Sequence, residues 1–124
     1  MLPRLTIAQD GLTAADLYRN TKVAFGYNYV DGDLDITHDH DSAGDHGTHV
    51  SGIATANRYV PKDGGFASAA ETVLSCGVAP EAQLLVMKVF GKNGGAYADD
   101  YMAAIQDAIS LGCDAINLSL GSNS

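Results

Sequence analysis

A nearly continuous apolar run, residues 82–90, constrains the fold of this chain more than any other feature. The run reads Ala-Gln-Leu-Leu-Val-Met-Lys-Val-Phe and lies between Pro80 and Gly91. A strand that is buried on both faces has this composition, and such strands occur mainly in parallel sheets covered by helices. The run therefore predicts a central strand of an α/β domain.

The segments after this run extend the α/β pattern. A Gly-rich turn at residues 91–95 leads to a helical stripe that ends at Gly112, a typical C-terminal stop. The stripe consists of Met102, Ile105, Ala108 and Ile109. Residues 114–120 then have the pattern of a second short buried strand. Strand, helix and strand at this spacing predict a right-handed crossover between parallel strands.

The first half of the chain predicts a further strand and two helices. Residues 22–30 alternate apolar side chains on one face, the period-two signature of a strand. These side chains are Val23, Phe25, Tyr27 and Tyr29. Residues 13–18 favour a short helix, and the acid-rich residues 31–45 favour a loop.

A second helix is indicated from Gly47 onward by the spacing of Val50, Ile53 and Ala54, and Pro61 is expected to end it. Residues 61–75 have the composition of a surface excursion rather than of a linker between domains.

Composition narrows the classes of partner. The net charge of −8 and pI near 4.5 repel phosphate backbones and anionic lipid, so nucleic acid and membrane surfaces are unfavourable partners. No apolar run approaches the ~20 residues that span a bilayer. Cys76 and Cys113 lack the spacing of a metal site, and two buried thiols are favoured over one disulfide.

Two histidines, His46 and His49, stand where the acidic loop becomes the second helix. Three hypotheses fit them. A zinc site could draw further ligands from residues 38–41, which read His-Asp-His-Asp, but the order matches no common zinc motif. The histidines could instead be hydrogen-bonded structural residues at a helix N-terminus. The third hypothesis is a general base, since imidazole exchanges protons near neutral pH.

Residues 46–54, His-Gly-Thr-His-Val-Ser-Gly-Ile-Ala, resemble the histidine motif of the subtilisin-like serine proteases, the subtilases. Two further blocks follow in the family order. Residues 77–89 resemble the Gly-Val-Ala-Pro-x-Ala…Val-Lys-Val strand, and residues 116–121 resemble the Ile-Asn-Met/Leu-Ser-Leu-Gly strand. The similarity extends over about residues 22–122 and leans toward the lactocepin-like cell-envelope proteinases.

The resemblance implies a partial subtilisin-like parallel sheet with helices packed on it, over residues 22–124, preceded by an irregular segment at residues 1–21. It implies that His46 is the catalytic base and that His49 supports it. It also implies two edges of a substrate cleft, where a peptide backbone would pair. The cleft residues are Ser119, Leu120 and Gly121 on one edge, and Gly94, Gly95 and Tyr97 on the other.

The other catalytic blocks of the family are missing from the sequence. No apolar strand ends in aspartate followed by serine or threonine and glycine, and Asp10-Gly11 is a poor substitute. No Gly-Thr-Ser-x-Ala/Ser-x-Pro block supplies a nucleophile. We therefore expect an inactive fragment of a larger endopeptidase. The alternatives are a catalytically dead subtilase-like interaction domain and a zinc or calcium binding module.

The family chemistry requires no cofactor, but calcium is a candidate stabiliser. Asp31, Asp33 and Asp35 alternate as in the start of a calcium loop, although the glycine and glutamate of an EF-hand are misplaced. The alternative is a solvated acidic loop. Expected partners are a protein or peptide substrate, the rest of the parent chain, and further copies joined through exposed strand edges. Family habit places the parent outside the cell or at its envelope.

Overall fold

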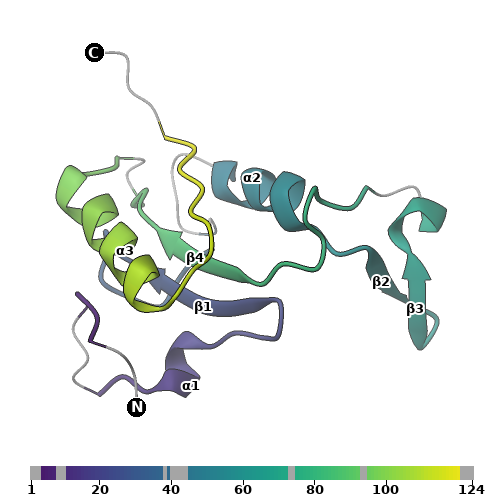
Figure 1. Cartoon of the computed structure of the whole chain (residues 1–124), viewed down its shortest axis with the longest axis horizontal. Coiled ribbons are helices and arrows are strands. Elements are labelled where there is room, and N and C mark those ends of the chain that lie inside the picture. Colours follow the sequence, from purple (N-terminus) through teal and green to yellow (C-terminus); the bar gives the residue numbers. More distant parts are fainter. Residues whose placement is uncertain are drawn as a thin grey trace. The chain divides into compact units, whose positions relative to one another are not determined.

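The structure is a computed structural model that describes residues 4–7, 11–37, 39, 45–72, 75–92 and 95–120. The chain divides into two compact units, one formed by residues 1–44 and 85–124 and the other by residues 45–84. Each unit is described by itself (Figure 1). The elements in chain order are α1 (Ala14–Leu17), β1 (Val23–Asn28), α2 (His46–Thr55), β2 (Tyr59–Lys62), β3 (Gly65–Ser68), the 3₁₀ turn η1 (Ala69–Thr72), β4 (Leu84–Lys88) and α3 (Ala98–Ser110).

The first unit is built on a parallel two-stranded sheet of β1 and β4 (Figure 1). Beyond the end of β1 the pairing continues, because the Tyr29 N–H donates to the Lys88 carbonyl at 2.8 Å. Strand β1 is fully buried from Phe25 to Asn28, whereas β4 is half-buried along its length. Both strands and the α/β class are confirmed.

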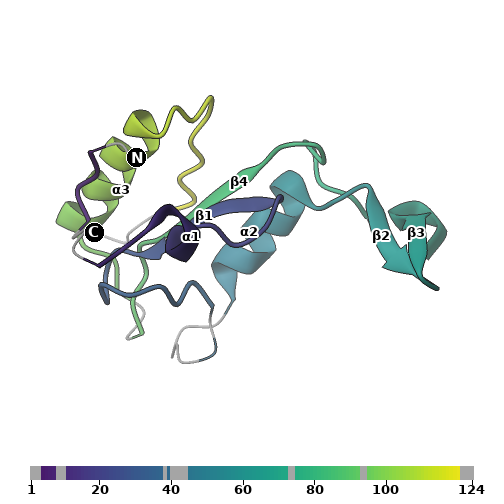
Figure 2. The same cartoon turned by 90° about the horizontal axis from the view of Figure 1, so that it is seen from below.

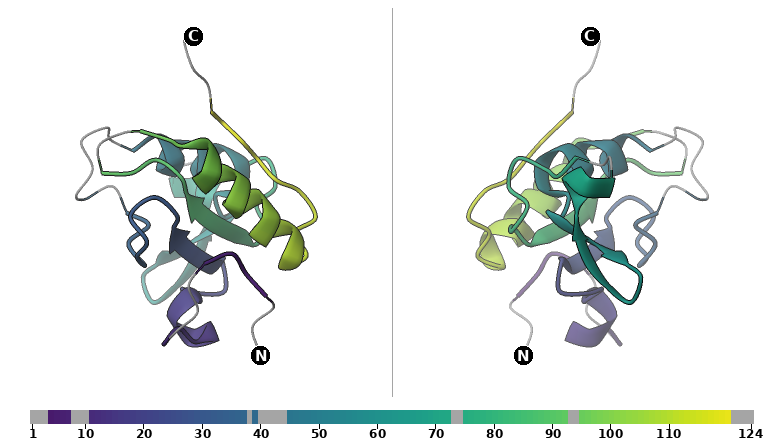
Figure 3. Two further views of the ribbon diagram at one scale, coloured as in Figure 1. Left: turned by 90° about the vertical axis from the view of Figure 1, so that its left-hand side faces the viewer. Right: turned by 90° about the vertical axis from the view of Figure 1, so that its right-hand side faces the viewer.

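Helices α1 and α3 complete this unit. Helix α3 lies across the sheet (Figure 3, left), and Ala104 contributes to the core. Helix α1 contacts β1 and begins with a capping box, in which Thr13 and Asp16 satisfy each other's backbone amides. The buried core cluster consists of Leu5, Ile7, Leu17, Phe25, Tyr27, Tyr29, Val89 and Ala104.

The predicted apolar stripe of α3 is confirmed for the buried Ala108 but is wrong for Met102 and Ile109. Met102 and Ile109 are 61% and 68% exposed, whereas Asp107 is completely buried. The reason is a hydrogen-bond network. The Asp107 carboxylate accepts the Thr6 amide and hydroxyl, both at 2.7 Å, and the Tyr29 hydroxyl at 2.8 Å. A carboxylate can be buried when several donors form hydrogen bonds with it. These bonds therefore place the polar Asp107 on the side of α3 that faces the core.

The predicted strand over residues 114–120 is also wrong. Residues 115–120 form no strand, and Ile116 and Leu118 are 45% and 52% exposed. A strand needs a neighbour to pair its backbone groups, and within the described residues of this unit only β1 and β4 form a ladder. The apolar pattern alone therefore does not produce a strand here.

The second unit contains α2 and the antiparallel β2–β3 hairpin (Figure 2). Asp63 and Gly64 both have positive φ, of 51° and 80°, as in the tight turns that suit the twist of hairpins. The exposed excursion predicted for residues 61–75 is thus largely this hairpin and η1. Helix α2 ends at Thr55, before the predicted stop at Pro61.

Helix α2 confirms the helix that was expected from Gly47 onward. Helix α2 has no buried residue, and Ile53 is 60% exposed. Of the three residues whose spacing indicated this helix, Val50 and Ala54 are half-buried. Within the described parts of both units, no helix has the length and apolarity that crossing a membrane requires.

Candidate functional site

Helix α2 presents the two motif histidines to solvent. His46 is the first residue of the helix, and His49 lies one turn further on. Both side chains are exposed. The helix starts after Asp45, whose carbonyl accepts the His49 amide at 3.1 Å but whose side chain makes no cap. An exposed imidazole in the first turn of a helix has a defined position and open access for a substrate.

The Gly-Val-Ala segment at residues 77–79 fixes the other end of α2. The amides of Gly77, Val78 and Ala79 donate at 2.8–3.0 Å to carbonyls of Ala56, Ile53 and Ala54 respectively. These carbonyls belong to the end of the helix, where intrahelical donors run out. The segment therefore anchors the histidine-bearing helix through its backbone.

Gly77 allows this close approach. A Cβ atom at Gly77 would lie 2.5 Å from the backbone nitrogens of Thr55 and Ala56, closer than real Cβ contacts. Only glycine fits without a backbone shift. The sequence showed the Gly-Val-Ala-Pro block but not this role, because the signal lies in a contact between distant segments.

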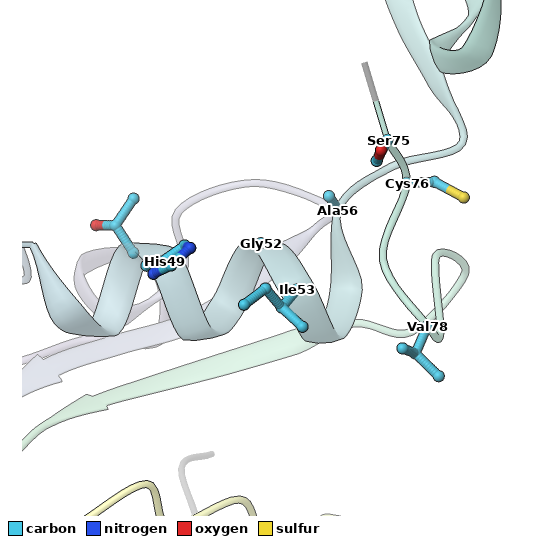
Figure 4. Close-up of a pocket in the computed structure, with 8 residues that line it drawn as sticks. His49, Gly52, Ile53, Ala56, Ser75, Cys76 and Val78 are labelled. Atoms are coloured by element: carbon cyan, nitrogen blue, oxygen red, sulfur yellow. The ribbon is translucent and has the colours of Figure 1, made fainter. Parts of the chain in front are cut away.

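A hollow of about 500 Å³ lies along α2 within the second unit (Figure 4). His49 and Ile53 reach it from the helix, and Val78 from the anchoring segment, while the Cys76 sulfur points away from the helix. His46 is not among its lining residues. The hollow is lined by His49 alone of the two motif histidines, so it adds nothing to the case for His46. Its lining residues are Thr48, His49, Gly52, Ile53, Ala56, Ser75, Cys76 and Val78.

The candidate substrate-binding residues that can be described lie in the first unit. Tyr97 caps α3 and is 64% exposed, and the Gly95 carbonyl accepts the Gly91 amide at 3.0 Å. Ser119 is exposed, and its hydroxyl accepts the Asn117 amide at 2.9 Å. Leu120 is half-buried. Gly94 and Gly121 lie outside the described residues. The role of all six in substrate binding stays a prediction.

The acidic loop that follows β1 is organised by its own hydrogen bonds. The Asp31 carboxylate accepts the buried Asn28 amide at 2.9 Å, and Asp33 accepts the Asp35 backbone amide at 3.0 Å. Asp35 in turn accepts the Thr37 amide and hydroxyl. Such side-chain to backbone bonds are typical of turns.

Metal binding gains no support from the described part of the chain. There, no three His, Cys, Asp or Glu side chains gather as a ligand set. His38, His40 and Asp41, which the zinc hypothesis used, lie outside the described residues, as does Asp10. Calcium at Asp31, Asp33 and Asp35 therefore stays a prediction.

Both cysteines are free thiols. Cys113 is half-buried but Cys76 is exposed, so the expectation that both are buried is wrong for Cys76. Burial, followed by the charge of Asp114, raises the pKa of the Cys113 thiol.

Comparison with known proteins identifies a family and several relatives that are named as proteases. Residues 5–124 match the model of the subtilase family of peptidases. The chain is 42% identical to the PI-type proteinase of Lactococcus lactis subsp. cremoris over 86% of its length. It is 35% identical to the minor extracellular protease Vpr of Bacillus subtilis over 87%, and 39% identical to the C5a peptidase of Streptococcus pyogenes over 91%.

These matches cover only 5%, 12% and 9% of the three relatives respectively. No solved structure matches the chain significantly. The similarity to the PI-type proteinase agrees with the lactocepin-like branch that the motifs indicated. Because the family model spans nearly all of the sequence, this chain belongs to the subtilase family.

Proposed function

We propose that this chain supplies the general base and part of the substrate cleft of a subtilisin-like serine endopeptidase. The carrying observation is His46, which opens α2 with its side chain exposed and stands first in the family's histidine motif. The aspartate and serine would come from sequence beyond these residues, since the matched relatives are many times longer than the match.

In the proposed reaction, the His46 imidazole accepts the proton of a serine hydroxyl as the serine oxygen bonds to the substrate carbonyl carbon. The imidazolium then gives that proton to the amine as the peptide C–N bond breaks. A water molecule next gives a proton to His46 as its oxygen bonds to the acyl carbon, and His46 then returns that proton to the serine oxygen as the acyl–serine C–O bond breaks. An aspartate would hold the imidazole in the required tautomer.

Supporting residues would act through binding rather than proton transfer. His49 lies one turn beyond His46 and lines the hollow beside α2, so we assign it a structural role. Residues 94–97 and 119–121 would pair with the substrate backbone. We propose an extracellular or cell-envelope location for the parent protein, because one relative is named as an extracellular protease.

Labelling with a fluorophosphonate, which reacts with activated serines, tests this function on the natural polypeptide that contains the chain. His46→Gln keeps a polar side chain but removes the base. Loss of the histidine in subtilisin itself lowers kcat by about 10⁶, and we expect labelling and peptide hydrolysis to collapse similarly. Lys62→Gln, another exposed site in the same unit, is the control and should leave both unchanged.

Two outcomes would contradict the proposal. If the folded wild-type polypeptide neither labels nor cleaves, the dead interaction domain becomes the better assignment. If His46→Gln retains activity, another residue is the base. We also expect the isolated 124-residue chain to be inactive, because it contains no serine nucleophile block.

A further inference from the structure

The two edges of the β2–β3 hairpin differ in their capacity to bind another strand. Opposite residues in an antiparallel ladder alternate between hydrogen-bonded pairs and pairs whose backbone groups point outward. The Ala69 amide donates to the Arg58 carbonyl at 2.8 Å. Arg58 and Ala69 are therefore a hydrogen-bonded pair, and they lie one position beyond the pair of Tyr59 and Ser68 that ends the hairpin. Counting along the register, the outward-pointing pairs are Tyr59 with Ser68 and Pro61 with Phe66.

The outer edge of β2 is unsuited to pairing with another strand, whereas the outer edge of β3 is suited to it. On β2, Pro61 has no N–H to offer at its outward position, and proline on an edge strand opposes pairing. On β3, Phe66 directs an N–H and a carbonyl outward, and Ser68 directs its N–H outward. Among the described residues, no further hydrogen bond to these backbone groups is present. The outer edge of β3 is therefore a template for an added strand.

Exposed aromatic side chains accompany this edge. Tyr59, Pro61 and Phe66 lie on one face of the hairpin, because cross-strand partners and residues two apart share a face. Tyr59 is 59% exposed and Phe66 is 78% exposed. Aromatic faces bind apolar side chains and the cationic heads of lysine and arginine.

The negative charge of this chain determines which charge an added strand should have. The unit of residues 45–84 has four carboxylates and two basic side chains, and the Arg58 guanidinium is already paired with Glu81 at 3.1 Å. The whole chain has a net charge of −8. This field repels a second copy and attracts a basic segment.

We propose that the outer edge of β3, with Phe66 beside it, binds an extended, lysine- or arginine-containing segment of a polypeptide as an added strand. Main-chain hydrogen bonds would supply the affinity, and the aromatic face and acidic field would supply the preference. The identification of that segment as part of a protein substrate, held away from the reacting peptide bond, rests on the proposed protease function. The binding itself does not.

Nuclear magnetic resonance of the 124-residue chain tests this site with two short capped peptides, one alternating lysine with valine and one alternating glutamate with valine. The lysine peptide should shift and protect the amides of Phe66 and Ser68. Ser68→Pro removes one outward donor and should weaken binding about tenfold, while Ser68→Thr retains the donor and should bind normally. Phe66→Thr provides a second loss variant that keeps strand propensity.

Three results would overturn the site. The first is equal binding of the glutamate peptide, and the second is shifts confined to the acidic loop. The third is shifts of Phe66 and Ser68 that depend on protein concentration without peptide, which would identify a second copy as the occupant. Fluorophosphonate labelling of the natural polypeptide is a separate readout, so failure of the β3 site and failure of the protease function can be told apart.

Discussion

The two units hold their main helices in different ways. In the first unit, buried side chains hold the helix: α3 buries Ala104, Ala108 and the hydrogen-bonded Asp107. In the second, α2 buries no residue, and its end is held by backbone hydrogen bonds that only Gly77 permits. The buried network holds α3 through its side chains, whereas the backbone bonds hold the end of α2 and leave its histidine side chains exposed.

Removing the buried carboxylate should affect stability most. Asp107→Ala leaves the buried Tyr29 hydroxyl and the part-buried Thr6 amide without their acceptor. Unsatisfied buried donors cost about 1–3 kcal/mol each, so we expect the free energy of unfolding to fall by about 4 kcal/mol. Urea titration followed by circular dichroism measures it.

Gln106→Ala is the matched control, because Gln106 is the exposed neighbour on the same helix. Its effect should stay within about 0.5 kcal/mol. A loss for Asp107→Ala no larger than that of the control would contradict the view that side-chain hydrogen bonds secure α3.

The backbone anchor predicts opposite effects for two glycines. Gly77→Ala forces a methyl group against the Thr55 and Ala56 nitrogens and should destabilise the chain by about 3 kcal/mol. Gly52→Ala has open space around the new methyl group and lies inside α2, so it should stabilise by about 0.5–1 kcal/mol. Thermal unfolding of both variants measures the difference. Equal effects would show that the approach at Gly77 does not anchor the helix.

The same contrast explains what the sequence could predict. Strand β1 followed from apolar alternation and strand β4 from a nearly continuous apolar run, because both belong to a sheet whose core is present in the described residues. The phase of α3 did not, because the hydrogen bonds to Asp107 come from Thr6 and Tyr29, far away in the chain. Local patterns have no access to such long-range partners.

For the candidate site, motif resemblance predicted the family, which the comparisons confirm, and it singled out His46, whose catalytic role stays a prediction. The helix that carries His46 was also expected, because the spacing of Val50, Ile53 and Ala54 is helical. The prediction of a strand over residues 114–120 was wrong because an apolar pattern shows only that a segment could pair as a strand. It does not show that a neighbouring strand is there to pair with it. Exposed candidate site residues are therefore better predicted from the residue types in a motif than from an apolar pattern, which indicates only burial.

The buried network also predicts a loss of stability in alkali. Burial, and then the hydrogen bond to Asp107 and its charge, raise the pKa of the Tyr29 hydroxyl above its usual value of 10.0. The unfolded chain therefore releases this proton at a lower pH than the folded chain. Stability is fully present below pH 10 and declines as the pH rises above it, because the unfolded state binds fewer protons there.

Tyr29→Phe separates this contribution from that of Tyr27, whose pKa is also raised, by burial and then by Asp33. The variant should lose stability at pH 7, and its further loss above pH 10 should be smaller than that of the wild type. Unfolding midpoints between pH 7 and pH 11 measure both. Parallel curves for the two proteins would show that Tyr29 does not link proton release to unfolding.

The smallest effect concerns the two cysteines, one in each unit, and changes rate rather than stability. Cys76 is exposed, whereas Cys113 is half-buried and the pKa of its thiol is raised by burial and then by Asp114. Because the thiolate is the reactive form, a water-soluble disulfide reagent at pH 8 should modify Cys76 before Cys113. Cys76→Ser should remove the fast phase and Cys113→Ser the slow one. A single phase, with equal rates at both thiols, would mean that the reagent reaches the half-buried Cys113 as easily as the exposed Cys76. The first unit would then protect its cysteine no better than the second unit, which carries His46.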